Sequence, residues 1–371
     1  MKFSCTKENL LYGMQSIVSV ATKATHLPIL RNVLIEATDT GLVLTATDLE
    51  MTVRVKVRAK VEEVGLFTLP AQLLTNYLTV CTGDRLDVGI NDKIATIHAD
   101  GQDTKMYGED AKDFPLIPEL RTKQEFQVSC QALVSGFKQV MVAVAREETR
   151  PEFTSVLLKT EKNTLYCAAT DTYRLAEKRL QLLQGDTSQT SVLVPARSLQ
   201  EFIRLQLKDD IITVLLGETQ IGYKTPNIEF YSRLVDGVFP DYQAVLPNDF
   251  VTTVVFNKQE CLQAVKATSL FARSGLFDIN LHCDPETNCI TMTAVNTQTG
   301  EQTTKLSAHI TGEANHVVFN YKFFLDALAQ FTTPTIKMML VNNQAPVRFE
   351  PIVPETETTP DYFHVIVPIK P

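Results

Sequence analysis

The sequence predicts an α+β protein of three similar domains, each with two helices packed on an antiparallel sheet. This fold class rests on a motif that recurs at a domain-sized spacing, on amphipathic helices around each copy, and on strands with alternating apolar residues. The copies are Thr45-Ala46-Thr47-Asp48, Ala168-Ala169-Thr170-Asp171 and Thr293-Ala294-Val295-Asn296, at steps of 123 and 125 residues. Solenoid repeats have periods of about 20–50 residues, so this spacing indicates a whole domain copied twice.

The first helix of each domain is marked by apolar residues at three- and four-residue steps, which is typical of a helix with one buried face. Ser129 is a suitable cap for the second of these helices, and Asn257 with Glu260 resembles a capping box for the third. The apolar positions are Leu10, Leu11, Met14, Ile17 and Val18 in the first domain, Leu133, Phe137, Val140, Met141 and Val144 in the second, and Leu262, Val265 and Leu270 in the third.

The second helix of each domain is expected to begin at Pro70, Pro195 and Asn320. Proline is favoured at the first helical position and asparagine at the cap. The expected apolar faces are Leu73, Leu74, Tyr77 and Leu78, then Leu199, Phe202 and Ile203, then Phe324, Leu325 and Leu328.

Between the helices the apolar period changes to two, which indicates strands. From Met51 to Val61 the valines alternate with basic residues, so we expect one half-buried antiparallel strand there. Further strands are expected at Ile211 to Leu216 and Thr335 to Val341. Polar segments near 120–127 and 247–251 then separate three domains, at residues 1–122, 127–248 and 250–371.

Composition limits the class of protein. Apolar residues make up 44% of the chain and charged residues 21%, which is typical of a soluble globular protein. The sequence contains no run of about 18 apolar residues, so we expect no membrane span. The N-terminus lacks the apolar stretch of a signal peptide. The seven cysteines are scattered without a zinc-ligand spacing, so we expect free thiols, a cytoplasmic location and no metal.

Charge is unevenly distributed. The net charge is −8, but the predicted helical segments with their flanks contain 13 basic and 6 acidic residues. A basic helical layer would attract a polyanion without regard to sequence, whereas the plainer interpretation is that lysines and glutamates decorate exposed helix faces. The alternating Arg54, Lys56, Arg58 and Lys60 are interpreted as one solvated sheet face.

An enzyme is the first alternative, because Asp48 and Asp171 recur. The third copy has Asn296 instead, and a turn role, in which the side chain bonds its own backbone, fits all three better. The chain has no phosphate-binding glycine loop and its six histidines are dispersed, so we expect no catalysis and no cofactor. A monomeric three-domain adaptor that binds peptides but not DNA is the second alternative.

The chain resembles the bacterial sliding clamps, the beta subunits of the replicative DNA polymerase, over essentially its whole length. The residues that carry the resemblance are Leu27 to Leu30, Thr45 to Met51, Ala169 to Ala176, Leu234 to Tyr242 and Val365 to Ile369. The resemblance implies a head-to-tail homodimer that forms a six-domain ring, with helices lining a hole through which duplex DNA passes. It also implies a non-catalytic processivity factor for the polymerase.

The resemblance further implies three sets of site residues. Partners would be double-stranded DNA, a second copy of the chain, the polymerase alpha subunit, the clamp loader and other proteins with short Gln- and Leu-containing motifs. The DNA-facing candidates are Lys7, Lys23, Lys138, Arg146, Arg150, Arg197, Arg204, Lys266, Arg273 and Lys322. The partner-peptide pocket would comprise Phe153, Thr170, Thr172, Tyr173, Arg174, Leu175, Pro240, Val245, Pro346, Val365, Ile366, Val367, Pro368 and Ile369. The dimer interface would include Thr104, Met106, Leu270 and Phe271.

Three positions depart from the family pattern. Thr172 stands where relatives often have glycine, Ala244 replaces a common basic residue, and the chain ends in Pro371. These departures bear on which partner motifs bind best, because the first adds a methyl group near the expected pocket floor.

Overall fold

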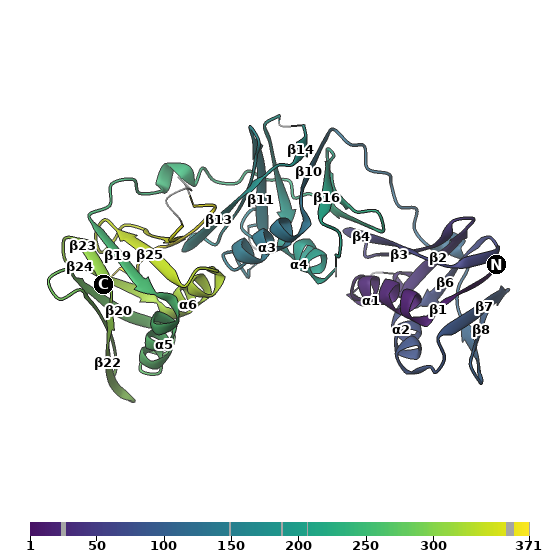
Figure 1. Cartoon of the computed structure of the whole chain (residues 1–371), viewed down its shortest axis with the longest axis horizontal. Helices are drawn as coiled ribbons and strands as arrows, with labels where there is room; N and C mark the ends of the chain where they lie inside the picture. The colour runs from purple at the N-terminus through teal and green to yellow at the C-terminus, as the bar shows by residue number, and fades with distance from the viewer. Residues whose placement is uncertain (24–26, 148–149, 187, 206, 354–359, 371) are drawn as a thin grey trace. The chain divides into compact units, whose positions relative to one another are not determined.

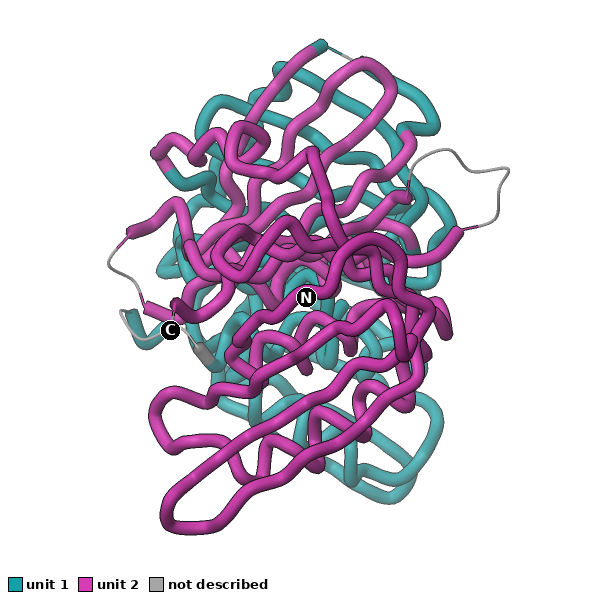
Figure 2. The backbone as a smooth tube through the Cα atoms, turned by 90° about the vertical axis from the view of Figure 1, so that its left-hand side faces the viewer, with its two compact units in different colours: residues 1–131, 182–188, 197–235 teal, residues 132–181, 189–196, 236–371 magenta. Residues whose placement is uncertain are grey.

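The structure consists of antiparallel sheets with α-helices packed against them (Figure 1). It is a computed structural model that describes residues 1–23, 27–147, 150–186, 188–205, 207–353 and 360–370. The chain divides into two compact units (Figure 2). Unit 1 comprises residues 1–131, 182–188 and 197–235, and unit 2 comprises residues 132–181, 189–196 and 236–371. Each unit therefore contains one end of the chain and part of its middle third.

Unit 1 contains a nine-stranded sheet in the order β14-β10-β16-β17-β18-β4-β3-β2-β6 and a five-stranded sheet in the order β5-β1-β7-β8-β9. Its elements are β1 (Lys2–Thr6), α1 (Lys7–Lys23), β2 (Asn32–Thr38), β3 (Gly41–Thr47), β4 (Met51–Val57), β5 (Lys60–Glu63), β6 (Gly65–Pro70), α2 (Ala71–Val80), β7 (Arg85–Asn91), β8 (Ile94–Ala99), β9 (Gln102–Tyr107), β10 (Gln124–Ser129), β14 (Gln184–Gly185), most of α4 (Ala196–Arg204), β16 (Ile211–Leu216), β17 (Gln220–Lys224) and β18 (Ile228–Arg233).

Unit 2 contains a nine-stranded sheet in the order β15-β11-β12-β13-β27-β26-β25-β19-β23 and a four-stranded sheet in the order β22-β21-β20-β24. Its elements are most of α3 (Cys130–Met141), β11 (Ser155–Glu161), β12 (Thr164–Thr170), β13 (Arg174–Gln181), β15 (Thr190–Pro195), β19 (Thr252–Asn257), α5 (Lys258–Ser269), β20 (Asp278–Asp284), β21 (Cys289–Asn296), β22 (Gly300–Ser307), β23 (His309–Gly312), β24 (Asn315–Asn320), α6 (Tyr321–Gln330), β25 (Thr335–Leu340), β26 (Val347–Pro351) and β27 (Tyr362–Ile366).

Two strand pairs connect segments that are far apart in the sequence, and we call each pair a junction. At the first junction β4 pairs with β18, with Val53 opposite Phe230. At the second junction β13 pairs with β27, with Ala176 opposite His364. Each nine-stranded sheet therefore joins strands from two of the predicted domains. The sequence patterns predicted strands but not this pairing, because strand periodicity carries no information about the partner strand.

The expected α+β class is confirmed, since helices pack in pairs on antiparallel sheets. In unit 1, α1 packs against α2, β3 and β4; in unit 2, α5 packs against α6, β21 and β22. The buried helical positions include Leu10, Met14 and Ile17 on α1 and Phe324 and Leu328 on α6. Leu73, which was expected on the buried face of α2, is 53% exposed, because Ala71, Leu74, Thr75 and Leu78 face the core instead.

Helix starts agree with the prediction to within one residue. The Asn257 side chain accepts hydrogen bonds from the backbone amides of Gln259 and Glu260, and Asn320 caps α6 in the same way through Lys322. The two prolines are placed differently from the prediction. Pro70 and Pro195 end the preceding strands, and the helices begin one residue later.

The strand expected from Met51 to Val61 is two strands. β4 ends at Val57, and β5 begins at Lys60 in a different sheet. The basic stripe is divided accordingly, with Arg54 and Lys56 on β4 and Arg58 in the connection. An alternating pattern continues through a short break in the backbone, so it could not reveal the change of sheet.

Candidate functional site

The three copies of the recurring motif each end a strand at a turn. Asp48 Oδ1 accepts hydrogen bonds from the amides of Glu50 and Met51, and Asp171 Oδ1 from those of Tyr173 and Arg174. Asn296 Oδ1 accepts from the amide of Gln298. The expected turn role of these side chains is confirmed.

The second copy of this turn forms one wall of a pocket. Thr170 Oγ1 donates to the Arg174 carbonyl at 2.7 Å and accepts from the Thr172 amide at 3.1 Å. These bonds hold Thr172 at φ +77°, a left-handed conformation that is unfavourable for a β-branched residue. The turn thus presents a fixed surface at the second junction, directly before β13.

The pocket has a volume of about 220 Å³ and its walls are mainly apolar. They come from the turn, the start of β13, the loop after residue 236, and the last strand with its following segment. Ten of the expected pocket residues line it: Phe153, Thr170, Thr172, Arg174, Leu175, Pro240, Val245, Pro346, Val365 and Val367. A small concave site with apolar walls and few polar groups is the usual form of a binding site for a short ligand segment.

Four expected residues do not line this pocket. Ile366 is fully buried and Pro368 is also buried, while the amide of Ile369 donates to the Val318 carbonyl at 2.8 Å and fixes the tail to β24. Tyr173 is 62% exposed and faces the next hollow. Ala244 is exposed outside the pocket lining, and Pro371 lies outside the described residues.

Sequence reasoning missed Asp241, Tyr242 and Leu246, which also line the pocket. Tyr242 is 6% exposed, and its hydroxyl donates to Glu177 at 2.5 Å. Glu177 also accepts from Arg179 Nε at 2.7 Å. Burial and the Glu177 carboxylate raise the pKa of Tyr242 far above its usual range, so the hydroxyl remains a donor. This bond anchors the loop that forms one side of the pocket.

Arg174 connects the pocket to α6. Its guanidinium bonds Asp171 at 2.9 Å and Asp326 at 2.7 Å, and it lies over the Phe323 ring at 4.4 Å. Its side chain is only 4% exposed. A buried cation with two carboxylate partners is held in one orientation, because breaking either bond leaves an uncompensated charge.

A neighbouring hollow of about 600 Å³ shares Phe153, Thr172 and Arg174 with the pocket. Three of the DNA-facing candidates, Arg146, Arg150 and Lys322, line this hollow together with Tyr173. The ring of Tyr173 stacks on Phe323 with 6.5 Å between centroids. The structure therefore brings expected pocket residues and expected DNA-facing residues to one surface of unit 2.

The DNA-facing candidates were taken from the predicted helices and their flanks, and Arg146, Arg150 and Arg273 lie in the flanks, beyond the helix ends. α3 ends at Met141 and α5 at Ser269, and each is followed by tight turns in which amides bond the third carbonyl back. Apolar residues such as Val144 continue the helical spacing past these ends and extended the prediction too far. The candidates on helices are Lys7, Lys23, Lys138, Arg197, Arg204, Lys266 and Lys322, of which the Lys23 side chain lies outside the described residues.

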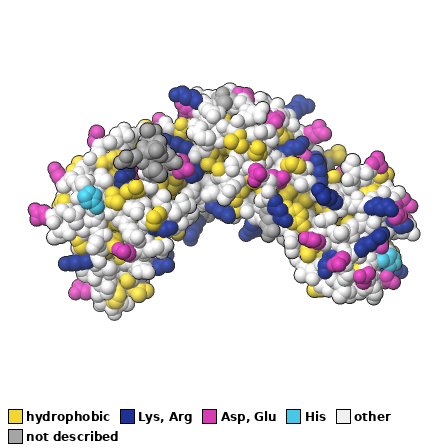
Figure 3. Space-filling model, in the orientation of Figure 1, with side chains coloured by type: hydrophobic (Ala, Val, Ile, Leu, Met, Phe, Trp, Pro, Cys, Tyr) yellow, Lys and Arg dark blue, Asp and Glu magenta, His cyan; other side chains and the backbone are white. Residues whose placement is uncertain are grey.

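Several candidates already have partners within the chain. Arg197 bonds Asp48 at 3.2 Å, Arg204 bonds Glu201 at 2.8 Å, and Arg273 pairs with Asp278. Lys7 donates to the Cys81 carbonyl at 3.1 Å. Lys138 and Lys266 are exposed and form no ion pair with a carboxylate of the described residues. On the face of the first 120 residues seen in Figure 3, both signs of charge are mixed.

The expected interface residues lie at two exposed places. Thr104 and Met106 are on β9, the edge strand of the five-stranded sheet, where Met106 points inward and is 3% exposed. Leu270 directly follows α5 and is 76% exposed, and Phe271 beside it is half-buried. An unpaired edge strand and an exposed leucine are both suited to contact another chain.

Metal and membrane sites were also sought. Among the residues that the structure describes, no group of three or more His, Cys, Asp or Glu side chains is placed to hold a metal ion. None of the described helices is both long and apolar enough to cross a membrane.

Comparisons with known proteins identify the family of the chain. Residues 1–118, 127–241 and 243–369 match, in order, the N-terminal, central and C-terminal domains of the DNA polymerase III beta subunit. The beta sliding clamp of Synechococcus elongatus is 30% identical over 381 residues, covering 100% of this chain and 99% of that protein. The beta sliding clamp of Bacillus subtilis is 27% identical over 357 residues, covering 93% of this chain and 94% of that protein.

Solved structures give the same result. The crystal structure of the DNA polymerase sliding clamp from Bacillus subtilis matches with a TM-score of 0.93 at 26% identity, covering 100% of this chain and 99% of that one. The DNA polymerase III subunit beta from Pseudomonas aeruginosa matches with a TM-score of 0.92 at 26% identity, covering 100% of both chains. The chain therefore belongs to the DNA polymerase III beta subunit family, the bacterial beta sliding clamps.

Proposed function

We propose that two copies of this chain close head to tail into a ring around duplex DNA and tether the replicative polymerase as a non-catalytic processivity factor. The single observation that supports this best is the apolar pocket at the second junction, whose walls come from three distant segments of a clamp-family chain. The ring acts in the cytoplasm, needs no cofactor, and takes its partners from the polymerase alpha subunit, the clamp loader and other proteins with clamp-binding motifs.

Ring closure is supported by the edge strand β9 and by the exposed Leu270 and half-buried Phe271 after α5. A contact between different surfaces of identical chains closes into a ring when the rotation permits it. Light scattering at micromolar concentration should give a mass twice the chain's 41.4 kDa. A mass of one chain would overturn ring closure and favour the monomeric adaptor.

Weak, sequence-independent contact with DNA is supported by the exposed Lys138 on α3 and Lys266 on α5. Phosphate contacts of lysine weaken with salt, and a closed ring can keep them weak because topology holds the DNA. With a clamp loader and ATP, the protein should stay on a nicked circular plasmid and leave the same plasmid after linearisation. Equal retention on both forms would contradict topological holding.

The lysines can be tested by a matched pair of variants. Lys138→Glu with Lys266→Glu should reduce loading on nicked circles and lower its salt dependence. Lys56→Glu, a change at another exposed lysine that lies on β4, should leave loading unchanged. A loss of loading in the sheet variant alone would contradict the assignment of the helices to the DNA side.

Peptide binding is supported by the apolar walls at Leu175, Val365 and Val367 and by the fixed Arg174. We expect a labelled peptide with one glutamine and two leucines to bind here, with leucines in the apolar part. Val367→Asp should abolish this binding in fluorescence anisotropy, because Val367 is only half-buried and the charge enters the pocket without unfolding the chain. Ile352→Asp, a change at an exposed apolar residue outside the pocket, is the control, and unchanged affinity in Val367→Asp would refute the pocket.

A further inference from the structure

The turn before β4 repeats the geometry of the turn before β13. Thr47 Oγ1 donates to the Met51 carbonyl at 2.8 Å and accepts from the Leu49 amide at 3.1 Å, as Thr170 does with Arg174 and Thr172. Leu49 is at φ +76°, beside +77° for Thr172. The two turns have the same hydrogen bonds and a left-handed residue at the same position, so they are two copies of one turn motif.

The strands at the two junctions also correspond. The amide of Arg233, at the end of β18, donates to the Glu50 carbonyl at 2.9 Å. In the second junction the amide of Val367 donates to the Tyr173 carbonyl at 2.8 Å. The strand registers, together with these two bonds, align Thr52 with Leu175, Tyr231 with Val365, and Arg233 with Val367.

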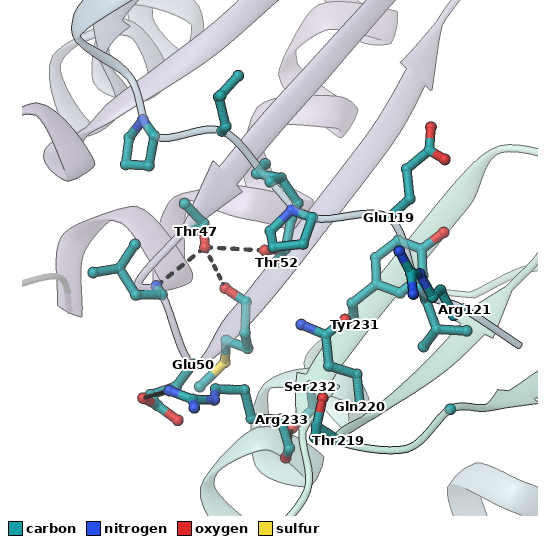
Figure 4. A pocket seen from close by; sticks show the side chains of 18 of the residues that line it. Thr47, Glu50, Thr52, Glu119, Arg121, Thr219, Gln220, Tyr231, Ser232 and Arg233 are labelled. Atoms are coloured by element: carbon teal, nitrogen blue, oxygen red, sulfur yellow. Dashed lines mark hydrogen bonds and ion pairs between the residues drawn. The ribbon is translucent and has the colours of Figure 1, made fainter.

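The first junction contains a pocket of its own, with a volume of about 480 Å³. Its lining comes from the turn, from the segment 115–121, from the β16–β17 connection and from β18 (Figure 4). The segment 115–121 occupies the place that the loop near Pro240 and Val245 takes in the second pocket. The pocket is therefore the counterpart of the peptide pocket, within unit 1.

The chemistry of the two pockets differs at the aligned positions. Where the second pocket has Leu175, Val365 and Val367, the first has a hydroxyl, a phenol and a guanidinium. Burial, with the nearby Glu229 carboxylate, raises the pKa of Tyr231 to about 12, so its hydroxyl remains protonated. Figure 4 shows the Gln220 amide in the middle of the pocket and Arg121 beside the Tyr231 ring. The hydroxyls of Thr52 and Tyr231 already donate to Thr47 and Glu229. The donors that can turn to a ligand are therefore the Gln220 amide and the guanidinium groups of Arg121 and Arg233.

The lining of this pocket contains three carboxylates, those of Glu50, Glu119 and Glu218, and two guanidinium groups. The guanidinium groups of Arg121 and Arg233 are the ones that can pair with an incoming carboxylate. Arg121 has no ion pair with a carboxylate of the described residues, and Figure 4 shows the Glu119 carboxylate pointing away from the pocket. Arg233 and Glu50 are 3.3 Å apart, with side chains 59% and 58% exposed. Such an exposed pair is weak, so Arg233 can exchange to a ligand. Lys123 bonds Glu218 at 2.8 Å and offsets its charge.

Apolar groups surround these donors at the rim. Leu116 is 97% exposed and Leu49 is 46% exposed, and both belong to the lining. Exposed leucines beside inward-facing donors fit a chain segment with an apolar side chain next to an acidic one. We propose that the first junction is a second peptide-binding site, which takes a short extended peptide that carries leucine and aspartate or glutamate.

This inference rests on the proposed function of the second pocket, from which the peptide class is taken. The probe is the hexapeptide acetyl-Ser-Leu-Asp-Leu-Asp-Ser-amide, titrated into the full-length protein with methyl groups labelled for NMR. The methyl signals of Leu49 and Ile117 should shift and saturate with a Kd below about 1 mM. The neutral analogue with asparagine in place of aspartate should bind at least about tenfold more weakly, since it lacks the charge that the arginines pair with.

The double variant Arg121→Gln, Arg233→Gln should bind the acidic probe at least about tenfold more weakly, because both exposed guanidinium groups are then lost. The same variant should bind the glutamine- and leucine-containing peptide at Val365 and Val367 unchanged, which also shows that it is folded. Shifts confined to Val365 and Val367, or equal affinity of the acidic and neutral probes, would overturn the second site and leave the proposed function intact. If the glutamine- and leucine-containing peptide does not bind at Val365, this result counts against the proposed function, whether or not the acidic probe binds.

Discussion

The two junctions share a backbone and differ in their side chains. Both have the same threonine–aspartate turn, the same amide–carbonyl bond from the partner strand and a connecting segment over the pocket. At the second junction the aligned side chains are mainly apolar and the arginine Arg174 is buried, whereas at the first they are polar and the arginines Arg197 and Arg233 are exposed. The comparison shows that a repeated backbone can keep one pocket geometry while side chains change the ligand that it fits.

The largest expected difference concerns the arginine that pairs with each turn aspartate. Arg174→Ala should lower the free energy of unfolding by about 3 kcal/mol, because it leaves Asp171 and Asp326 without their buried cation. Arg197→Ala should cost less than Arg174→Ala, because Arg197 is 57% exposed and pairs with one carboxylate, that of the buried Asp48, whereas Arg174 is 4% exposed and pairs with two. Urea denaturation measures both, and similar costs would show that burial does not separate the two junctions.

The next effect is a pH dependence specific to the second junction. His364 is fully buried, and burial, with the Arg174 charge, lowers its pKa to about 3, whereas the aligned residue of the first junction is Phe230. Between pH 6.5 and 3 the unfolded chain binds a proton that the folded chain does not, so stability falls as pH falls. We expect a loss of about 2 kcal/mol from pH 7 to 5.

Urea denaturation at several pH values measures this dependence. His364→Phe should remove the contribution of this group and reduce the slope. An unchanged slope in the variant would assign the pH dependence to other groups, such as carboxylates.

A smaller effect is expected at the tyrosines beside the two pockets. Tyr242→Phe removes the bond to the buried Glu177, which keeps its bond to Arg179, so the change should cost about 1.5 kcal/mol and weaken peptide binding several-fold as the loop loosens. Tyr231→Phe removes a bond to Glu229 at a half-buried position and should cost less. Anisotropy with the glutamine-containing peptide distinguishes loop anchoring from general stability, because Tyr231→Phe should leave that affinity unchanged.

The smallest expected effect concerns the strained residue of each turn. Thr172→Gly should raise stability by about 1 kcal/mol, because glycine accepts φ +77° without the strain of a β-branched side chain. Leu49→Gly should be nearly neutral, since relief of a smaller strain is offset by the greater freedom of glycine in the unfolded chain. Thermal unfolding compares them, and a destabilised Thr172→Gly would mean that the methyl group contributes packing that outweighs the strain.

The sequence by itself determined the repeat, the fold class, the helix caps at Asn257 and Asn320, the aspartate turns and most of the pocket lining. These features depend on contacts within a few residues or on motifs long enough to identify a family, so a linear pattern carries them. The resemblance supplied the pocket residues, but the sequence did not point to Tyr242, because its partner Glu177 is 65 residues away.

Only the tertiary structure decided which strands meet across the thirds of the chain, where the basic stripe divides between two sheets, and which arginines are already paired. It also revealed the pocket at the first junction, which brings together segments near residues 50, 118, 219 and 232. Strand pairing and ion pairs join residues that are distant in sequence, and their energies depend on burial and register, which no local pattern encodes.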